Sequence, residues 1–155
     1  MELRIDGKVV FAATGGKEFD SASPAVIFIH GAGMDHTVWA LQTRWFAWHG
    51  YSVLAVDLPG HGKSEGSALE TIEEMATWMV RLIDVCGAEK IGLIGHSMGS
   101  LVALAAAAKV GARAFFQLAQ NELKSTSESF SEDLQYQGPF SFFFHQKSEN
   151  SDFFE

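Results

Sequence analysis

Gly95-His96-Ser97-Met98-Gly99 is a G-x-S-x-G pentad that lies between an apolar run, Ile91 to Ile94, and an alanine-rich stretch, Leu101 to Ala108. This pattern predicts a strand, a sharp turn and a helix, with Ser97 at the corner. Such a turn projects the serine hydroxyl clear of the sheet and directs the next backbone N–H at developing negative charge. Ser97 is therefore the candidate nucleophile. The alternative, a serine that only caps the helix, is disfavoured by this strand–glycine–helix context.

Three short apolar runs have the pattern of strands that are covered on both faces. They are residues 25–29, 52–56 and 91–94. Asp6-Gly7 suits a tight turn between two further strands, so the chain is expected to open with a β-hairpin over residues 3–12. Strands that alternate with helical segments indicate an α/β fold with a mostly parallel sheet and flanking helices.

Apolar residues at helical spacing predict a helix in each connection between these strands. The first is expected to bury one face and to end at Gly50; this face is made by Val38, Leu41, Trp45 and Trp48. The second begins with a capping box at Thr71 and Glu74 and ends at Gly87. The third runs from about Ser97 to Val110.

Length and charge restrict the class of protein. The chain has 155 residues, is 47% apolar and carries a formal net charge of -8. This charge argues against nucleic acid and anionic membranes as partners, because both require a basic patch. No apolar stretch approaches the roughly 20 residues of a membrane-spanning helix, and Met1 to Asp6 lacks the apolar core of a secretory signal, so a cytoplasmic location is expected.

The composition changes after about Arg113. Residues 115–155 contain no valine, isoleucine, methionine or tryptophan, yet they hold nine of the thirteen phenylalanines. Two segments are therefore expected: a core over residues 1–114 and an atypical, Phe/Ser-rich tail over residues 115–155. Ala114 to Leu118 has the pattern of one more strand, so the sheet is predicted to be truncated after about the sixth strand. Truncation, fusion or a shifted reading frame would each explain the break.

A glycine-rich turn, His30-Gly31-Ala32-Gly33, follows the first buried strand. Such a turn presents backbone N–H groups without an intervening side chain. The N–H groups of Ala32 and Met98 are therefore candidates for an oxyanion hole, in which each donor contributes roughly 3 kcal/mol to the transition state. His30, Gly31 and His96 are expected to contact the substrate. The alternative is a plain turn from strand to helix.

Two other glycine patterns do not fit nucleotide binding. Gly62-Lys63-Ser64 lacks the earlier glycine of a phosphate-binding loop, since Asp57 occupies that position. Gly31-x-Gly33 lacks the third glycine of a dinucleotide-binding loop, since His36 stands there. We therefore expect no cofactor and no metal.

Three motifs in order resemble the α/β-hydrolase family: the turn at 30–33, the loop Asp57-Leu58-Pro59-Gly60-His61-Gly62-Lys63-Ser64 and the pentad at 95–99. The resemblance covers about residues 1–114. It implies Ser97 as nucleophile, the Ala32 and Met98 N–H groups as oxyanion hole, and a mainly structural role for the loop at 57–64.

A serine nucleophile requires a histidine base and an orienting acid, which in this family follow the serine in the order acid, then histidine. His145 is the one histidine after Ser97. It is the candidate base, with Glu122 or Asp133 as candidate acid. An incomplete sheet would leave an exposed edge, so self-association through that edge is expected.

Three functional interpretations stay open. The first is a serine hydrolase that acts on a carboxylic ester or a related small acyl substrate through an acyl-enzyme at Ser97. The second is a catalytically inactive fragment or a ligand-binding pseudoenzyme of the same family. The third is a branch with haloperoxidase, dehalogenase or lyase chemistry, although dehalogenases normally have an aspartate at the position of Ser97.

Overall fold

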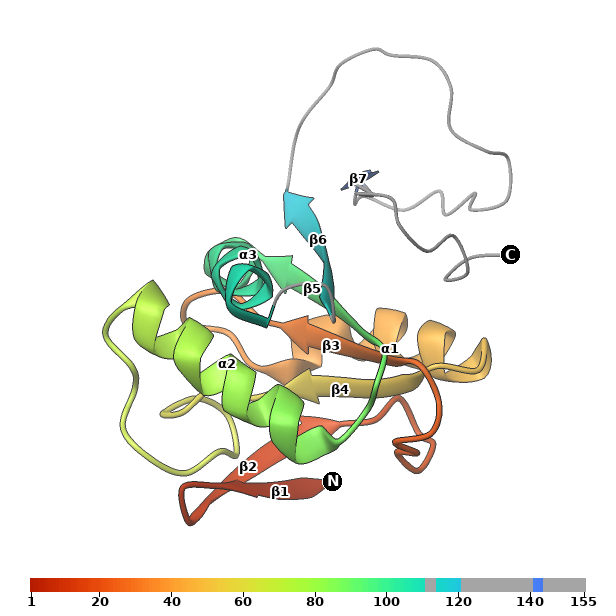
Figure 1. The fold of residues 1–155 in the computed structure, drawn as a ribbon, viewed down its shortest axis with the longest axis horizontal. Coiled ribbons are helices and arrows are strands. Elements are labelled where there is room, and N and C mark those ends of the chain that lie inside the picture. The colour runs from red at the N-terminus through yellow and green to blue at the C-terminus, as the bar shows by residue number, and fades with distance from the viewer. Residues whose placement is uncertain (111–113, 121–140, 144–155) are drawn as a thin grey trace.

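The computed structural model describes residues 1–110 together with the strands Ala114–Gln120 and Ser141–Phe143 (Figure 1). The chain opens with the expected hairpin, in which β1 (Glu2–Ile5) pairs antiparallel with β2 (Lys8–Ala13). Its turn places Asp6 at φ 51° and Gly7 at φ 76°. Two successive positive φ angles match the twist of a two-residue hairpin, which explains the Asp-Gly pair.

Parallel strands form the centre of the sheet, as the apolar runs predict. They are β3 (Ala25–Ile29), β4 (Ser52–Val56), β5 (Ile91–His96) and β6 (Ala114–Gln120). The described strands lie in the order β1-β2-β4-β3-β5-β6-β7. The short strand β7 (Ser141–Phe143) pairs antiparallel with the end of β6, so the sheet continues one strand beyond the sixth. This arrangement gives an α/β fold with a mixed, mainly parallel sheet.

Successive residues of β3 enter different cores. Ala25, Ile27 and Ile29 pack in the cluster that includes α2 (Ile72–Cys86) and α3 (Met98–Val110), whereas Val26 and Phe28 pack with Trp39 and Ala47. Alternate side chains of a strand point to opposite faces. Both faces of β3 are therefore covered by helices, which is why the strand is apolar at every position (Figure 1).

The second helix has the limits that the sequence predicts. Thr71 and Glu74 form the capping box, and Gly87 closes the helix at φ 72°. The core-facing residues are Met75, Ala76, Trp78, Met79, Leu82, Ile83 and Cys86. In the part of the chain that the structure describes, no helix is both long enough and apolar enough to cross a membrane.

The predicted buried face of the first helix is wrong. The segment forms a 3-10 turn, η1 (His36–Trp39), followed by α1 (Ala40–Trp48), but Leu41 and Trp48 are 72% and 79% exposed. The buried side chains are those of Trp39, Thr43 and Ala47. These three residues also have helical spacing. They are the ones that face the sheet, because the ring centroids of Trp39 and Phe28 lie 5.1 Å apart and the small side chain of Ala47 lets the helix pack close to the strands.

The capping box yields a stability prediction. We expect Thr71→Ala to lower the free energy of unfolding by about 1 kcal/mol, because the Glu74 N–H then loses its acceptor. Thr71→Ser keeps the hydroxyl and serves as the matched control. Chemical denaturation of both variants measures the difference, and equal stability of the alanine and serine variants would contradict the role of the cap.

Candidate active site

Ser97 lies at the corner between β5 and α3. Its φ is 52°, in the left-handed region that non-glycine residues rarely adopt, and the residue is exposed. Its carbonyl accepts a hydrogen bond from the Ser100 N–H at 2.9 Å, and the Ser100 hydroxyl donates to the Gly95 carbonyl at 2.7 Å. These local bonds hold the strained corner, so the Ser97 hydroxyl lies at the carboxyl end of the sheet.

The two glycines of the pentad have no room for a side chain. A Cβ on Gly95 would lie 2.2 Å from the Gly99 carbonyl oxygen, and a Cβ on Gly99 would lie 2.2 Å from the Ile29 carbonyl oxygen. Both distances are far inside van der Waals contact. The first turn of α3 thus lies directly against the end of β3, where the glycine-rich turn begins.

The glycine-rich turn contacts the serine corner. A Cβ on Gly31 would lie 3.0 Å from His96 Nδ1, and Gly31 itself is buried while Ala32 is exposed. Among the described residues no acceptor bonds the Ala32 N–H. Met98 begins α3, where the first N–H groups of a helix lack partners within the helix. The fold therefore brings the segments that carry the two candidate oxyanion donors next to each other.

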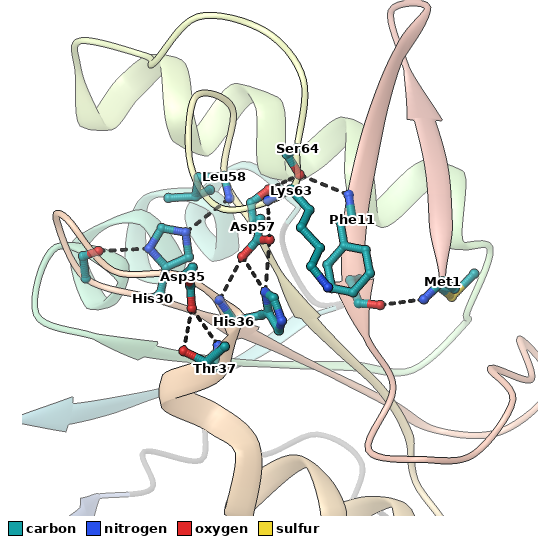
Figure 2. Close-up of polar contacts among 12 residues, drawn as sticks. Met1, Phe11, His30, Asp35, His36, Thr37, Asp57, Leu58, Lys63 and Ser64 are labelled. Atoms are coloured by element: carbon teal, nitrogen blue, oxygen red, sulfur yellow. Dashed lines mark hydrogen bonds and ion pairs between the residues drawn. The ribbon is translucent and has the colours of Figure 1, made fainter.

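His30 and His96 differ in how far they are buried. His30 is fully buried, its Nδ1 bonds the Gly31 carbonyl at 2.8 Å, and its Nε2 accepts the Leu58 N–H at 3.1 Å (Figure 2). These bonds leave no free ring nitrogen, so the expectation that His30 contacts a substrate does not fit its position. His96 is half-buried, and its Nδ1 has no hydrogen-bond partner among the described residues.

The electrostatics of His30 favour the neutral ring. Desolvation by burial lowers the pKa of His30 and is the largest influence on it, with a smaller downward contribution from His61, whose ring lies 5.0 Å away. The hydrogen bond to Gly31 and the charges of Asp57 and Asp35 act in the opposite direction. A neutral ring with its proton on Nδ1 satisfies both hydrogen bonds at once.

Asp57 organises the neighbouring loop through contacts that the sequence did not reveal. Its fully buried carboxylate accepts hydrogen bonds from the His36 N–H at 2.7 Å, from His36 Nδ1 at 2.9 Å and from the Lys63 N–H at 2.9 Å (Figure 2). Gly62 sits against it, since a Cβ there would lie 2.2 Å from Oδ2. The Ser64 hydroxyl donates to the Asp57 carbonyl and accepts from the Phe11 N–H. The loop at 57–64 thus joins β2, β4 and η1.

Asp35, His36 and Asp57 bring three potential metal-ligating atoms within 4.8 Å of one another. Their mutual geometry has an internal explanation. Asp35 caps η1 by accepting from the N–H and the hydroxyl of Thr37, and His36 pairs with Asp57. The cluster is accounted for by hydrogen bonds within the chain.

His145, Glu122 and Asp133 lie outside the described residues. Among those that are described, no side chain is hydrogen-bonded to the Ser97 hydroxyl. The site is thus defined by a strained, exposed serine and by two adjoining backbone segments.

Comparison with known proteins places this geometry in a family. A model of the "Alpha/beta hydrolase family" matches residues 26–143. The chain is 36% identical over 78 residues, half of its length, to (E)-2-((N-methylformamido)methylene)succinate hydrolase of Acinetobacter baylyi. It is 40% identical over 101 residues, 64% of its length, to the dihydrolipoyllysine-residue acetyltransferase component of the acetoin cleaving system of Cupriavidus necator. The matched parts span 29% and 25% of these relatives.

A solved structure agrees with the sequence matches. Epoxide hydrolase A of Mycobacterium thermoresistibile superposes with a TM-score of 0.56 at 30% identity, covering 69% of this chain and 34% of that chain. The similarity therefore extends over the described core and over about a third of the solved enzyme.

The packing of the pentad yields a prediction about the corner. We expect Gly95→Ala to destabilise the protein by about 2 kcal/mol or more, because the added methyl overlaps the Gly99 carbonyl. Gly92→Ala on the same strand is the matched control, since its Cβ would meet nothing closer than 3.9 Å. Thermal unfolding measures the stability of both variants. Equal melting temperatures would show that the corner can accommodate the added methyl group, which would contradict the prediction.

Proposed function

The chain belongs to the alpha/beta hydrolase family, and on that premise we propose that it carries the nucleophile and oxyanion hole of a serine hydrolase for carboxylic esters or related small acyl substrates. The observation that carries the proposal is the exposed Ser97 at φ 52°, between β5 and the first N–H groups of α3. We further propose that residues 1–114 are the catalytic core and residues 115–155 a distinct segment.

In the proposed reaction, the Ser97 hydroxyl attacks the acyl carbonyl and loses its proton to a base. The carbonyl oxygen becomes an oxyanion, which accepts hydrogen bonds from the Ala32 and Met98 N–H groups. The tetrahedral intermediate collapses, the alkoxide leaves with the proton from the base, and Ser97 stays acylated. Water then loses a proton to the base and attacks the ester carbonyl. The second tetrahedral intermediate releases the carboxylic acid, and Ser97 regains its proton from the base.

A serine at the corner favours acyl chemistry over displacement at carbon. A hydroxyl forms an ester with an acyl group, and that ester is hydrolysed by water once a base is present. A carboxylate nucleophile would suit dehalogenation, and this chain has none at position 97. One relative is named as a hydrolase of a substituted succinate and another as an acetyltransferase component. Both names are compatible with a small acyl substrate.

We propose His145 as the base, oriented by Glu122 or Asp133, because chain order in this family places acid and base after the nucleophile. Three of the histidines before residue 110 have ring nitrogens that are hydrogen-bonded within the chain. Both ring nitrogens of His30 are engaged, His36 is paired with Asp57, and His61 bonds the Pro59 carbonyl at 3.0 Å.

A second function, ligand binding without turnover, is favoured by the same observation. Within the described part of the chain, Ser97 has the strained corner but no imidazole hydrogen-bonded to it. A domain of this kind would bind a carbonyl compound at the oxyanion donors and leave it unchanged. Thermal stabilisation by an ester that is not hydrolysed would distinguish this function from catalysis.

Labelling with a fluorophosphonate tests the nucleophile. We expect covalent labelling of the wild-type protein and its loss in Ser97→Ala, because the reagent reacts with activated serines. Ser67→Ala is the control, since Ser67 is exposed and distant in sequence from the corner. Intact-protein mass spectrometry gives the readout. A folded wild-type protein that stays unlabelled would refute an activated Ser97.

Substitution of the candidate base tests the second half of the mechanism. If His145 is the base, His145→Gln lowers ester turnover by about 10⁴-fold or more, on the scale of triad deletions in serine proteases. His49→Gln is the control, because His49 is exposed and bonds only the Trp45 carbonyl at the end of α1. Unchanged turnover of p-nitrophenyl esters in His145→Gln would contradict the assignment.

A further inference from the structure

The Gly31 carbonyl and the Ala32 N–H belong to one peptide group. The carbonyl is held by two donors, His30 Nδ1 at 2.8 Å and the Met34 N–H at 3.2 Å. The peptide is trans, so its C=O and N–H point in opposite directions within one plane. Fixing the carbonyl toward the His30 ring therefore fixes the Ala32 N–H on the far side of the plane.

The His30 ring is itself held in place. Its Nε2 accepts the Leu58 N–H at 3.1 Å, and the ring is fully buried beside the His61 ring. One nitrogen must donate and the other must accept, which only the neutral Nδ1–H tautomer can do. The ring thus links the start of the loop after β4 to the Gly31–Ala32 peptide.

A second contact holds the far end of the same turn. The His36 N–H and Nδ1 bond the Asp57 carboxylate, next to Leu58 in the chain (Figure 2). The turn from His30 to His36 is therefore clamped at both ends to two consecutive residues. Loss of the His30 contact leaves the Asp57 clamp and the Met34 bond in place, so its main effect falls on the orientation of one peptide.

We propose that His30 is a positioning residue whose Nδ1–H tautomer orients the Ala32 N–H by holding the Gly31 carbonyl. This inference rests on the proposed function, in which the Ala32 N–H stabilises the oxyanion. It assigns His30 a role that involves no contact with substrate: the ring acts through the peptide group, and its own orientation depends on Leu58.

Two amide substitutions separate the two ring contacts. His30→Asn places an N–H near the position of Nδ1 and retains the donor to Gly31. His30→Gln places its amide near the position of Nε2, so it retains the acceptor for Leu58 and loses the donor to Gly31. If the ring only fills space, the two variants should behave alike. If the ring orients the Gly31–Ala32 peptide, His30→Gln should be more impaired than His30→Asn.

The first measurement is the rate of fluorophosphonate labelling at Ser97. We expect His30→Gln to slow labelling by about 100-fold, the scale of losing one oxyanion donor, and His30→Asn to stay close to the wild-type rate. Equal rates in the two variants would overturn the proposal.

The second measurement does not depend on activity. In ¹⁵N-resolved NMR spectra without ligand, the Ala32 amide resonance is expected to shift in His30→Gln and to stay near its wild-type position in His30→Asn. Failure of the wild-type protein to react with the fluorophosphonate would refute the proposed function alone, because the Ala32 resonance still decides the role of His30. An Ala32 resonance that is unchanged in His30→Gln would overturn the positioning role of His30.

A titration of the wild-type protein covers the case in which the variants do not fold. Protonation of Nε2 would set two N–H groups against each other at Leu58, so the ring must move. The Ala32 and Leu58 amide signals are then expected to shift together with the titration of the His30 ring. The signals of His61, Asp57 and Asp35, which face His30, are followed separately. Shifts that track those groups and not His30 would overturn the proposal.

Discussion

The close approach of three backbone segments at the carboxyl end of β3 is the constraint on which the rest of the site depends. Gly95 and Gly99 allow β5, α3 and β3 to meet at distances that any side chain would prevent. The consequence is a corner that turns through a left-handed residue, Ser97, and thus presents its hydroxyl outward. Without this contact, the serine and the glycine-rich turn would belong to separate surfaces.

Hydrogen bonds at the ends of β3 and β4 stabilise the loops around this corner. Burying a carboxylate or an imidazole is costly unless its polar atoms are satisfied, and here both groups are. Asp57 accepts from His36 and Lys63, while His30 joins Leu58 to Gly31. The buried polar groups thus give the backbone around the proposed oxyanion donors a definite shape.

Local signals in the sequence were sufficient for much of the fold. Asp6-Gly7 requires two positive φ angles, Thr71 and Glu74 satisfy each other's backbone donors, and the apolar runs mark doubly covered strands. The first helix shows where such signals fail. Two sets of its residues have helical spacing, and only contact with Phe28 and the sheet decides that Trp39 and Ala47 are buried.

The sequence by itself determined the α/β order, the hairpin, the second helix and the corner that carries Ser97, because each depends on neighbours within a few residues. Only the tertiary structure decided the orientation of α1, the place of β7 beside β6, and the partners of His30 and His36. These hydrogen bonds join residues 28 and 21 positions apart. Periodicity and turn chemistry carry no information on such pairs; strand order and packing bring them together.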